Sequence, residues 1–434
     1  MNAFPGRGAD HDDPTGAAAD AADERPGVAC DLDVLIVGGG LVGTGLAIAL
    51  DGCGFRVGLV EAAAPRINDE ASYDERNLAL ARASINALDA LDVLDDAAAR
   101  PTSIERIVVT RRGEFGSLCL DAAELRLPPF GGVLPARELG NALLRRLERC
   151  EGLVREVPAE VIALSPRRES IEVTLQTSEG GRRLATRLLV GADGSASFVR
   201  KTCGIGVAHH DYAQSAFVTT VTSERALAGC AYERFTESGP IALLPLGGNR
   251  AGLVLTVASS DADRVAALDD AAFLQLVHER FGYRAGRLSR PGKRKPYPLS
   301  RAIAEAVISP RTVLIGNAAQ TIHPIGAQGF NLGLRDALTL SELLREAAES
   351  KGDPGEAALL SRYGRNRAAD RTATVAFSDD LVRLMGNEFR PLGALRSLGF
   401  VALDRCAPLK RRFALRGMGF RGDAPALALS EHRS

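Results

Sequence analysis

The chain has 434 residues, which favours two or three domains at the usual size of about 100–200 residues each. Its 53 Lys and Arg nearly balance 54 Asp and Glu, so the charge totals indicate neither nucleic-acid binding nor a strongly basic membrane-binding patch. Seven scattered cysteines without a Cys-x-x-Cys pair indicate reduced thiols and no zinc site, and no apolar run is long enough for a transmembrane helix.

Residues 1–30 are acidic and rich in Ala and Gly, and they lack the basic start and apolar core of a secretory signal. We therefore expect a flexible leader there. Order is expected from Asp33, where an apolar run ends in glycines and is followed by a helical pattern and by the segment RVGLVE. This succession predicts a β-α-β unit, the start of a parallel sheet with right-handed crossovers.

Strand patterns recur further along the chain. Alternating strands separated by turns at Pro166 and Gly180-Gly181 occupy 159–191, and more strand-like segments run from about 216 to 257. A helical segment and a proline-containing connector then lead to the strand TVLIG at 312–316, and from Gly333 the pattern is mostly helical. The sequence thus predicts an α/β fold with two separate sheets.

The first strand-to-helix turn carries a Gly-x-Gly-x-x-Gly motif formed by Gly38, Gly40 and Gly43, and Glu61 ends the next strand about 20 residues later. The first glycine permits a tight turn, the second lets a pyrophosphate approach the helix N-terminus, and the third allows close helix packing. Glu61 can accept hydrogen bonds from a ribose diol. The motif indicates a site for FAD or NAD, since both contain ADP; the alternative is a turn that binds nothing.

Two later segments also place a turn after an apolar strand: LLVGADG, with Asp193 and Gly194, and TVLIGNAAQT, with Gly316 and Asn317. In this order the three motifs resemble those of the class A flavoprotein monooxygenases. Over residues 31–420, segments such as ERFTESGPIALLPL and GNAAQTIHPIGAQGFNLGLRDALTL are similar to the ubiquinone-biosynthesis hydroxylase family. Asn317, where the class usually has Asp, makes the last motif similar to that of the 2-octaprenyl-6-methoxyphenol hydroxylase branch.

The resemblance implies a Rossmann-like FAD-binding domain of the para-hydroxybenzoate-hydroxylase type, formed by residues 31–206 and 300–385. It also implies a mixed β-sheet substrate domain at 207–299 and a C-terminal helical region at 386–434. Asn317 is expected at the ribityl chain, where an amide can both donate to and accept from a hydroxyl group. The FAD contacts that the resemblance implies come from Gly38, Gly40, Gly43, Glu61, Arg76, Arg137, Asp193, Gly194, Gly316, Asn317 and Gly329, with Arg200 near the pyrophosphate.

The loop with Pro324, Gly326, Gln328 and Gly329 is expected beside the isoalloxazine. Its free N–H groups and the following helix N-terminus offer positive potential to the N1/C2=O edge. The family usually has Ala-Gly where this chain has Gly326-Ala327. If a positive φ is needed at the second position, Ala327 is strained by about 1 kcal/mol; otherwise the exchange is harmless.

Two histidine positions invite a functional interpretation. His323 precedes a proline and is expected to be structural, and the adjacent His209 and His210 lack a third ligand, so no metal site is expected. No residue of the substrate sheet can be assigned as a catalytic base from the sequence.

The resemblance implies an FAD-dependent monooxygenase that hydroxylates a polyprenylated phenol in ubiquinone biosynthesis. In this chemistry NAD(P)H reduces FAD, and O₂ forms a C4a-hydroperoxide that transfers its distal oxygen to the ring. The alternatives are an FAD-dependent prenyl-lipid reductase and a flavin-binding assembly subunit of the ubiquinone-synthesis complex.

The implied partners are the phenol, that complex and a membrane surface. Residues 388–420 mix apolar side chains with Arg and Lys, as an interfacial helix does, although a helix packed on the FAD domain or on a partner chain fits equally well. The expected location is the cytoplasm, peripheral to the inner face of the membrane.

Overall fold

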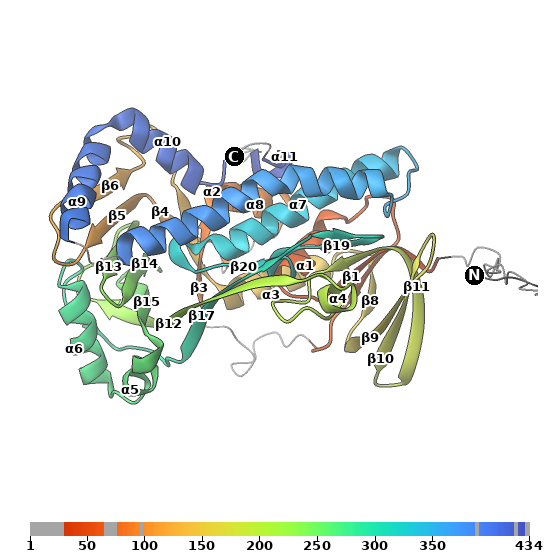
Figure 1. The fold of residues 1–434 in the computed structure, drawn as a ribbon, viewed down its shortest axis with the longest axis horizontal. Coiled ribbons are helices and arrows are strands. Elements are labelled where there is room, and N and C mark those ends of the chain that lie inside the picture. The colour runs from red at the N-terminus through yellow and green to blue at the C-terminus, as the bar shows by residue number, and fades with distance from the viewer. Residues whose placement is uncertain (1–29, 65–75, 96–98, 387–389, 421–423, 430–434) are drawn as a thin grey trace, which may run out of the picture.

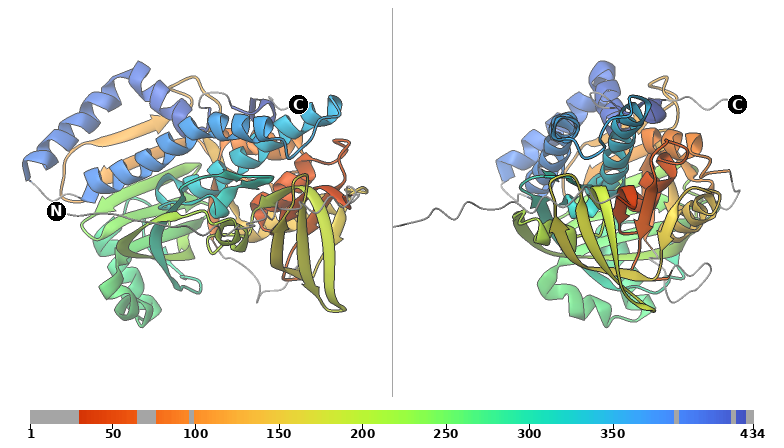
Figure 2. Two further views of the ribbon diagram at one scale, coloured as in Figure 1. Left: turned by 45° about the vertical axis from the view of Figure 1, so that its right-hand side comes forward. Right: turned by 90° about the vertical axis from the view of Figure 1, so that its right-hand side faces the viewer.

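The fold is taken from a computed structural model, which describes residues 30–64, 76–95, 99–386, 390–420 and 424–429. The predicted leader, apart from its last residue, lies outside the described residues. Two large β-sheets lie side by side, and the long C-terminal helices run along them (Figures 1 and 2). In the described part of the chain, no helix is both long and apolar enough to cross a membrane.

The first sheet contains the predicted β-α-β unit, with helix α1 (Leu41–Ala49) between its first two strands. The central parallel strands of this sheet are buried on both faces, which explains their mostly apolar sequences LDVLIV and VGLV. The strand order is β18 (Ile308–Ser309), β19 (Thr312–Leu314), β11 (Gly180–Gly191), β1 (Leu32–Val37), β2 (Val57–Val60) and β8 (Val154–Glu156). The strands from β19 to β8 are parallel. An antiparallel extension of β11 is formed by β10 (Ile171–Thr177) and β9 (Ala159–Pro166). Helix α4 (Phe198–Thr202) follows β11.

The second sheet is larger than the segment 207–299 predicted for it. Its order is β20 (Gln320–Thr321), β17 (Pro296–Ala304), β12 (Val207–Ser223), β15 (Arg250–Ala258), β14 (Gly239–Pro245), β13 (Cys230–Thr236), β5 (Arg106–Arg111) and β6 (Ser117–Asp121), with β16 (Leu288–Ser289) beside β12. β5, β6 and β20 come from the segments predicted for the FAD domain. Short apolar runs do not identify their partner strand, because that pairing is decided by contacts distant in sequence. One face of the sheet packs on α6 (Asp270–Phe281), which follows η3 (Ser259–Asp261) and α5 (Ala262–Ala266).

A third, small sheet lies between the two large ones. It consists of β3 (Asn77–Ala81), β7 (Gly131–Pro135) and β4 (Thr102–Ile104), and it leads into α2 (Arg82–Ala90) and α3 (Ala136–Leu147). A Cβ on Gly252 of β15 would lie 2.7 Å from Nδ2 of Asn77, so β3 lies directly against the second sheet at this glycine.

The helices after residue 327 are α7 (Gln328–Glu349), α8 (Ala357–Gly386), α9 (Arg390–Arg405), α10 (Ala407–Gly417) and α11 (Ala426–Leu429). Among them, α7 and α8 run along the sheets, whereas α9 and α10 lie at the end of the molecule beside β5 and β6 (Figure 1). Helix α7 begins at Gln328, earlier than the predicted start at Gly333, so Gly329 belongs to its first turn. Buried ion pairs join α7 to α8, with Arg335 to Asp370 at 2.7 Å and Arg367 to Asp336 at 2.8 Å.

Candidate active site

The predicted cofactor motifs meet at one edge of the first sheet. Because β1, β2, β11 and β19 are parallel, their carboxyl ends lie at the same edge. Gly38, Glu61, Asp193 and Gly316 each follow one of these ends within two residues. Open α/β sheets bind ligands beyond the carboxyl ends of their strands, so this edge is the candidate cofactor site.

The glycines of the first motif have three different surroundings. Gly38 has a φ of +107°, and a Cβ there would lie 2.5 Å from the carbonyl oxygen of Ala192. A Cβ on Gly43 would collide with the carbonyl oxygen of Gly38, so α1 packs directly on the turn. Nothing lies within 4 Å of a Cβ at Gly40, and the N-terminus of α1 has no side-chain cap. A phosphate group can therefore approach the unpaired N–H groups of α1.

Glu61 faces the first motif and is held there by backbone groups. Its Oε2 accepts a hydrogen bond from the N–H of Gly39 at 2.6 Å, and its Oε1 accepts one from the N–H of Ala63 at 3.0 Å. Each carboxylate oxygen has a second lone pair, so a ribose diol can still donate to Glu61 in this orientation.

Asp193 organises the second motif. Its Oδ2 accepts from the N–H of Val199 at 3.0 Å and its Oδ1 from the hydroxyl of Ser197 at 2.5 Å, at the start of α4. Arg200, expected near the pyrophosphate, is buried and donates to the carbonyl oxygen of Ala318 at 2.8 Å. Arg200 therefore joins the second motif to the third.

The third motif is held by a carboxylate that sequence reasoning missed. Gly316, with a φ of +59°, donates its N–H to Oδ2 of Asp336 at 3.2 Å, and Gln320 Nε2 donates to the same oxygen at 2.5 Å. The signal was a single acid in the buried helix segment NLGLRDALTL. Asn317 follows on η4 (Gly316–Ala318) with an exposed side chain, so its amide is accessible to a ligand.

The loop expected beside the isoalloxazine adopts the left-handed conformation at Gly326. Within η5 (Ile325–Ala327), Gly326 is the residue with non-helical angles, at φ +64° and ψ +15°. Its carbonyl oxygen accepts a hydrogen bond from Gln328 Nε2 at 3.1 Å. Glycine therefore stands where the positive φ occurs, and the exchange to Gly326-Ala327 does not strain the backbone.

The rest of this loop is open to a ligand. Pro324 and Gly326 are exposed, and nothing lies within 4 Å of a Cβ at Gly329 in the first turn of α7. The N–H groups of that first turn have no partner within the helix, as at any helix start.

His323 is a structural residue. It has no exposed surface, and burial lowers its pKa to about 4, so the imidazole is neutral at pH 7. Its Nδ1 accepts from the N–H of Ile325 at 3.2 Å, which assigns the proton to Nε2, 3.4 Å from Oε1 of Gln214. Both ring nitrogens are thus engaged in holding the loop on β12.

The third sheet brings Arg76 and Arg137 together. β3 and β7 pair with Asn77 opposite Pro135, and the N–H of Ala136 donates to the carbonyl oxygen of Arg76 at 2.8 Å. Arg76 is exposed, and the side chain of Arg137 is 46% exposed with Glu138 at 3.1 Å. Both arginines remain accessible to a ligand.

These features fit the ADP half of FAD. A glycine-lined turn leads into an uncapped helix N-terminus, and a carboxylate at the end of the next strand lies against that turn. Among the described residues, no group of three or more His, Cys, Asp and Glu side chains is placed to hold a metal ion.

Solved structures share this fold. The p-nitrophenol 4-monooxygenase PnpA from Pseudomonas putida superposes with a TM-score of 0.73 at 18% identity, over 89% of this chain and 98% of its own. PqsL from Pseudomonas aeruginosa gives a TM-score of 0.70 at 23% identity, over 86% of this chain and 99% of its own. The α/β architecture predicted from the sequence is thereby confirmed.

The sequence comparisons define the class and then the family. Residues 31–378 match the FAD binding domain family, so the protein is an FAD-dependent monooxygenase. It is 38% identical to the ubiquinone hydroxylase UbiL of Rhodospirillum rubrum over 89% of both chains, and 34% identical to the 3-demethoxyubiquinol 3-hydroxylase of Escherichia coli over 88% of this chain and 96% of that one. The chain belongs to the FAD binding domain family and, within it, to the ubiquinone-biosynthesis hydroxylases. Assignment to the 2-octaprenyl-6-methoxyphenol hydroxylase branch stays a prediction.

Proposed function

We propose that this enzyme hydroxylates the aromatic ring of a polyprenylated phenol in ubiquinone biosynthesis, with NAD(P)H and O₂ as co-substrates. The observation that carries the proposal is the meeting of the cofactor motifs at one sheet edge, in a chain 38% identical to a ubiquinone hydroxylase. Bound FAD supplies the redox chemistry of oxygen transfer. The protein has to bind and orient the cofactor, hold the phenol and exclude water.

Each part of the site has a role in this proposal. The N-terminus of α1 at Gly40 binds the pyrophosphate, Glu61 accepts from the ribose, and Asn317 bonds the ribityl chain. The loop at Gly326 and the first turn of α7 offer N–H groups to the pyrimidine edge, where negative charge develops on reduction. Arg76 and Arg137 bind the cofactor from the third sheet.

The experiment is oxygen uptake by the FAD-loaded protein with NAD(P)H and 2-octaprenyl-6-methoxyphenol. We expect uptake that needs both compounds and yields a hydroxylated ring. Reduction of a double bond without oxygen consumption would favour the prenyl-lipid reductase, and bound FAD without substrate-stimulated NAD(P)H oxidation would favour an assembly subunit of the ubiquinone-synthesis complex. In lipid extracts from a strain lacking the gene, the accumulated precursor identifies the branch by its unhydroxylated carbon.

We also propose a peripheral membrane contact through helices α9 and α10, because a prenylated substrate dissolves in lipid. The outward face of α9 is apolar over most of its length: Pro391, Ala394, Leu395, Leu398 and Ala402 are exposed, with Leu395 at 64% and Leu398 at 57%, and Arg405 is exposed in the last turn. The inward face instead carries Arg396, which donates to Glu114 at 2.5 Å. The inward face thus combines Arg396 with the buried Phe400, while the exposed leucines give α9 an apolar outer side, as expected of a helix whose outer side meets an apolar surface.

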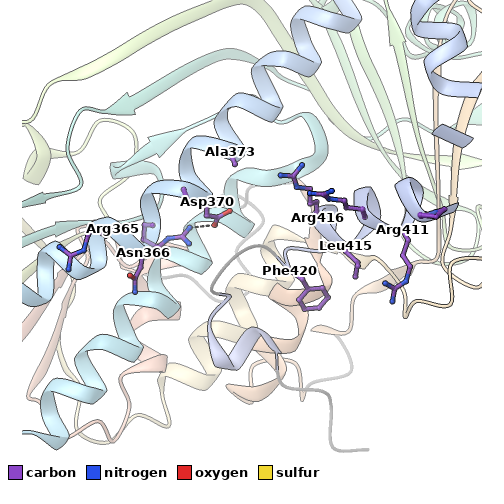
Figure 3. A pocket seen from close by; sticks show the side chains of 12 residues that line it. Arg365, Asn366, Asp370, Ala373, Arg411, Leu415, Arg416 and Phe420 are labelled. Carbon is purple, nitrogen blue, oxygen red and sulfur yellow. Dashed lines mark hydrogen bonds and ion pairs between the residues drawn. The ribbon is translucent and has the colours of Figure 1, made fainter. Parts of the chain in front are cut away.

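Positive charge accompanies this apolar face. Residues 390–420 contain seven Lys and Arg and one acid, in a chain with a net charge of −1. Arg396 and Lys410 are buried and paired with acids, whereas Arg405, Arg411, Arg412 and Arg416 are exposed. Arg365, Arg411, Arg412 and Arg416 line a groove of about 800 Å³ between α8 and α10 (Figure 3). Such a surface complements anionic phospholipid headgroups. Self-association about a two-fold axis would bring like charges together, which favours a bilayer over a second copy.

Flotation with vesicles tests this contact. Vesicles of phosphatidylglycerol and phosphatidylcholine in equal parts should carry the protein, and vesicles of phosphatidylcholine alone should carry less. The double variant Leu395→Glu/Leu398→Glu should stay in solution, whereas Ile162→Glu, at a similarly exposed residue of β9, should float like the wild type. Absence of flotation by the wild type, or a wild-type dimer in sedimentation that the double variant dissociates, would contradict the membrane contact.

A further inference from the structure

Glu233 is a carboxylate within an apolar row of the second sheet. On β13 it pairs with Ala242 of β14 on one side and with Val109 of β5 on the other, and Ala242 pairs in turn with Val254 of β15. Cross-strand partners share a face of a sheet, so these four side chains stand beside one another. All four are partly exposed, which makes this row accessible to a small molecule.

The row lies on the face of the sheet that is turned away from α6. The neighbours of Glu233 on β13 point toward α6: the ring of Tyr232 lies 6.0 Å from that of Phe281, and Arg234 Nε donates to the carbonyl oxygen of Arg280 at 3.1 Å. Successive side chains of a strand alternate between faces, so Glu233 points to the opposite side.

That opposite side faces the candidate cofactor site. Phe235, two residues from Glu233 and on the same face, belongs to the same apolar cluster as Ile325 of the loop assigned to the isoalloxazine. Gly252, on this face of β15, is covered by Asn77 of β3, the residue that follows Arg76. Asn77 therefore lies directly against the face that carries Glu233, and Ile325 belongs to the apolar cluster on that face.

The surroundings of Glu233 suit a ligand-binding carboxylate. Burial raises its pKa to about 7, although part of the side chain remains accessible. No hydrogen bond or ion pair engages its carboxylate among the described residues. An uncompensated carboxylate in apolar surroundings is a feature of functional sites, because a ligand can supply the missing hydrogen-bond donor.

We propose that Glu233 binds the hydroxyl group of the phenol substrate. The carboxylate accepts a hydrogen bond from the hydroxyl; the proton passes from the phenol oxygen to a carboxylate oxygen, and the O–H electron pair stays on the phenol oxygen. The ring becomes more electron-rich, which favours its attack on an electrophilic oxygen. The inference rests on the proposed function in taking the substrate to be a phenol, and it names the substrate contact that the sequence left unassigned.

The test compares the affinities of two ligands for the wild type and for variants of the oxidised, FAD-loaded enzyme. The ligands are a short-chain 2-prenyl-6-methoxyphenol and its methyl ether, which lacks the hydroxyl proton, and the flavin absorbance reports binding. We expect the wild type to prefer the phenol by about 10- to 100-fold, the range of one hydrogen bond to a charged group. Glu233→Gln should reduce this preference to a few-fold, and the control Glu237→Gln, four residues away and exposed, should retain it.

Two outcomes would overturn the assignment: an unchanged preference in Glu233→Gln, or a wild type that binds both ligands equally. Should Glu233→Gln fail to retain FAD, Glu233→Asp replaces it, and a phenol preference in that variant supports the assignment while equal binding of both ligands refutes it. Because no turnover is needed, a protein that discriminates the ligands but does not hydroxylate them would contradict the proposed function and leave the role of Glu233 intact.

Discussion

Asp336 of helix α7 accepts a hydrogen bond from the backbone N–H of Gly316, 3.2 Å away, directly before the turn that presents Asn317. Its other oxygen accepts from Nε of Arg367 on α8 at 2.8 Å, and the side chains of the pair are 0% and 3% exposed. The third cofactor motif is therefore held from behind by a buried ion pair between two helices.

Asp336→Asn should destabilise the protein by about 3–5 kcal/mol, because it removes one charge of a buried pair. Denaturant unfolding of the FAD-free protein measures this loss. The control is Glu346→Gln, whose pair with Arg362 is about half exposed on both sides and should cost at most about 1 kcal/mol. Equal losses in the two variants would contradict the role assigned to Asp336.

Two glycines of the first motif are expected to have different roles, one in packing and one in cofactor binding. Gly43→Ala should lower the melting temperature of the FAD-free protein, because its Cβ collides with the carbonyl oxygen of Gly38. Gly40→Ala has room for its Cβ in the FAD-free protein and should melt normally, yet bind FAD more weakly, since the methyl group occupies the path of the pyrophosphate. Thermal melting and titration with FAD distinguish the two effects, and normal FAD affinity in Gly40→Ala would place the pyrophosphate elsewhere.

The loop proposed to lie beside the isoalloxazine depends on glycine at one position. Gly326→Ala should cost about 1 kcal/mol of stability, because φ is +64° there. Gly329→Ala is the matched control: it lies in the first turn of α7 with nothing within 4 Å of its Cβ, and it should be neutral or slightly stabilising in the FAD-free protein. Unfolding free energies of both variants check this difference, and the opposite order would contradict it.

His323 should make the folded protein sensitive to mild acid. Burial lowers its folded pKa to about 4, below the ordinary value of 6.5 that it regains on unfolding. As the pH falls, the unfolded chain binds the proton before the folded protein does. The contribution of the neutral His323 to the free energy of unfolding is therefore complete above pH 6.5 and lost between pH 6.5 and 4. The full effect is about 3 kcal/mol. Unfolding experiments across this window should give a flatter profile for His323→Gln, whereas the exposed control His209→Gln should follow the wild type.

Much of this architecture follows from local sequence patterns. An apolar run, a glycine turn and a second apolar run predict the strand before Gly38, the helix after it and the strand ending at Val60. The two apolar runs require burial on both faces of the sheet. The turns around Gly180 and Gly194 were equally visible, because glycine marks places where φ is positive.

Other features required contacts between distant segments. β5 lies within the segment predicted for the FAD domain, yet it pairs with β13, which is more than 100 residues further along the chain, and β6 joins the same sheet through β5. The sequence does not show which residue pairs with Asp336 on α7. Only the fold places Arg367 of α8 beside it. The sequence of residues 388–420 fits an interfacial helix and a packed helix equally well, and only the inward packing of Arg396 and Phe400 shows that Leu395 and Leu398 point outward.

By itself, the sequence determined the α/β class, the order of the cofactor motifs and the family, because these depend on short-range periodicity and on glycines with steric tasks. The tertiary structure decided which motifs share an edge, where the left-handed residue of the loop lies and which carboxylate faces the cofactor site. Glu233 shows the physical reason. The strand sequence CAYERFT does not show on which face of the sheet the Glu233 side chain lies. Only the pairing of β13 with β5 and β14, with α6 on one side of the sheet, determines that face.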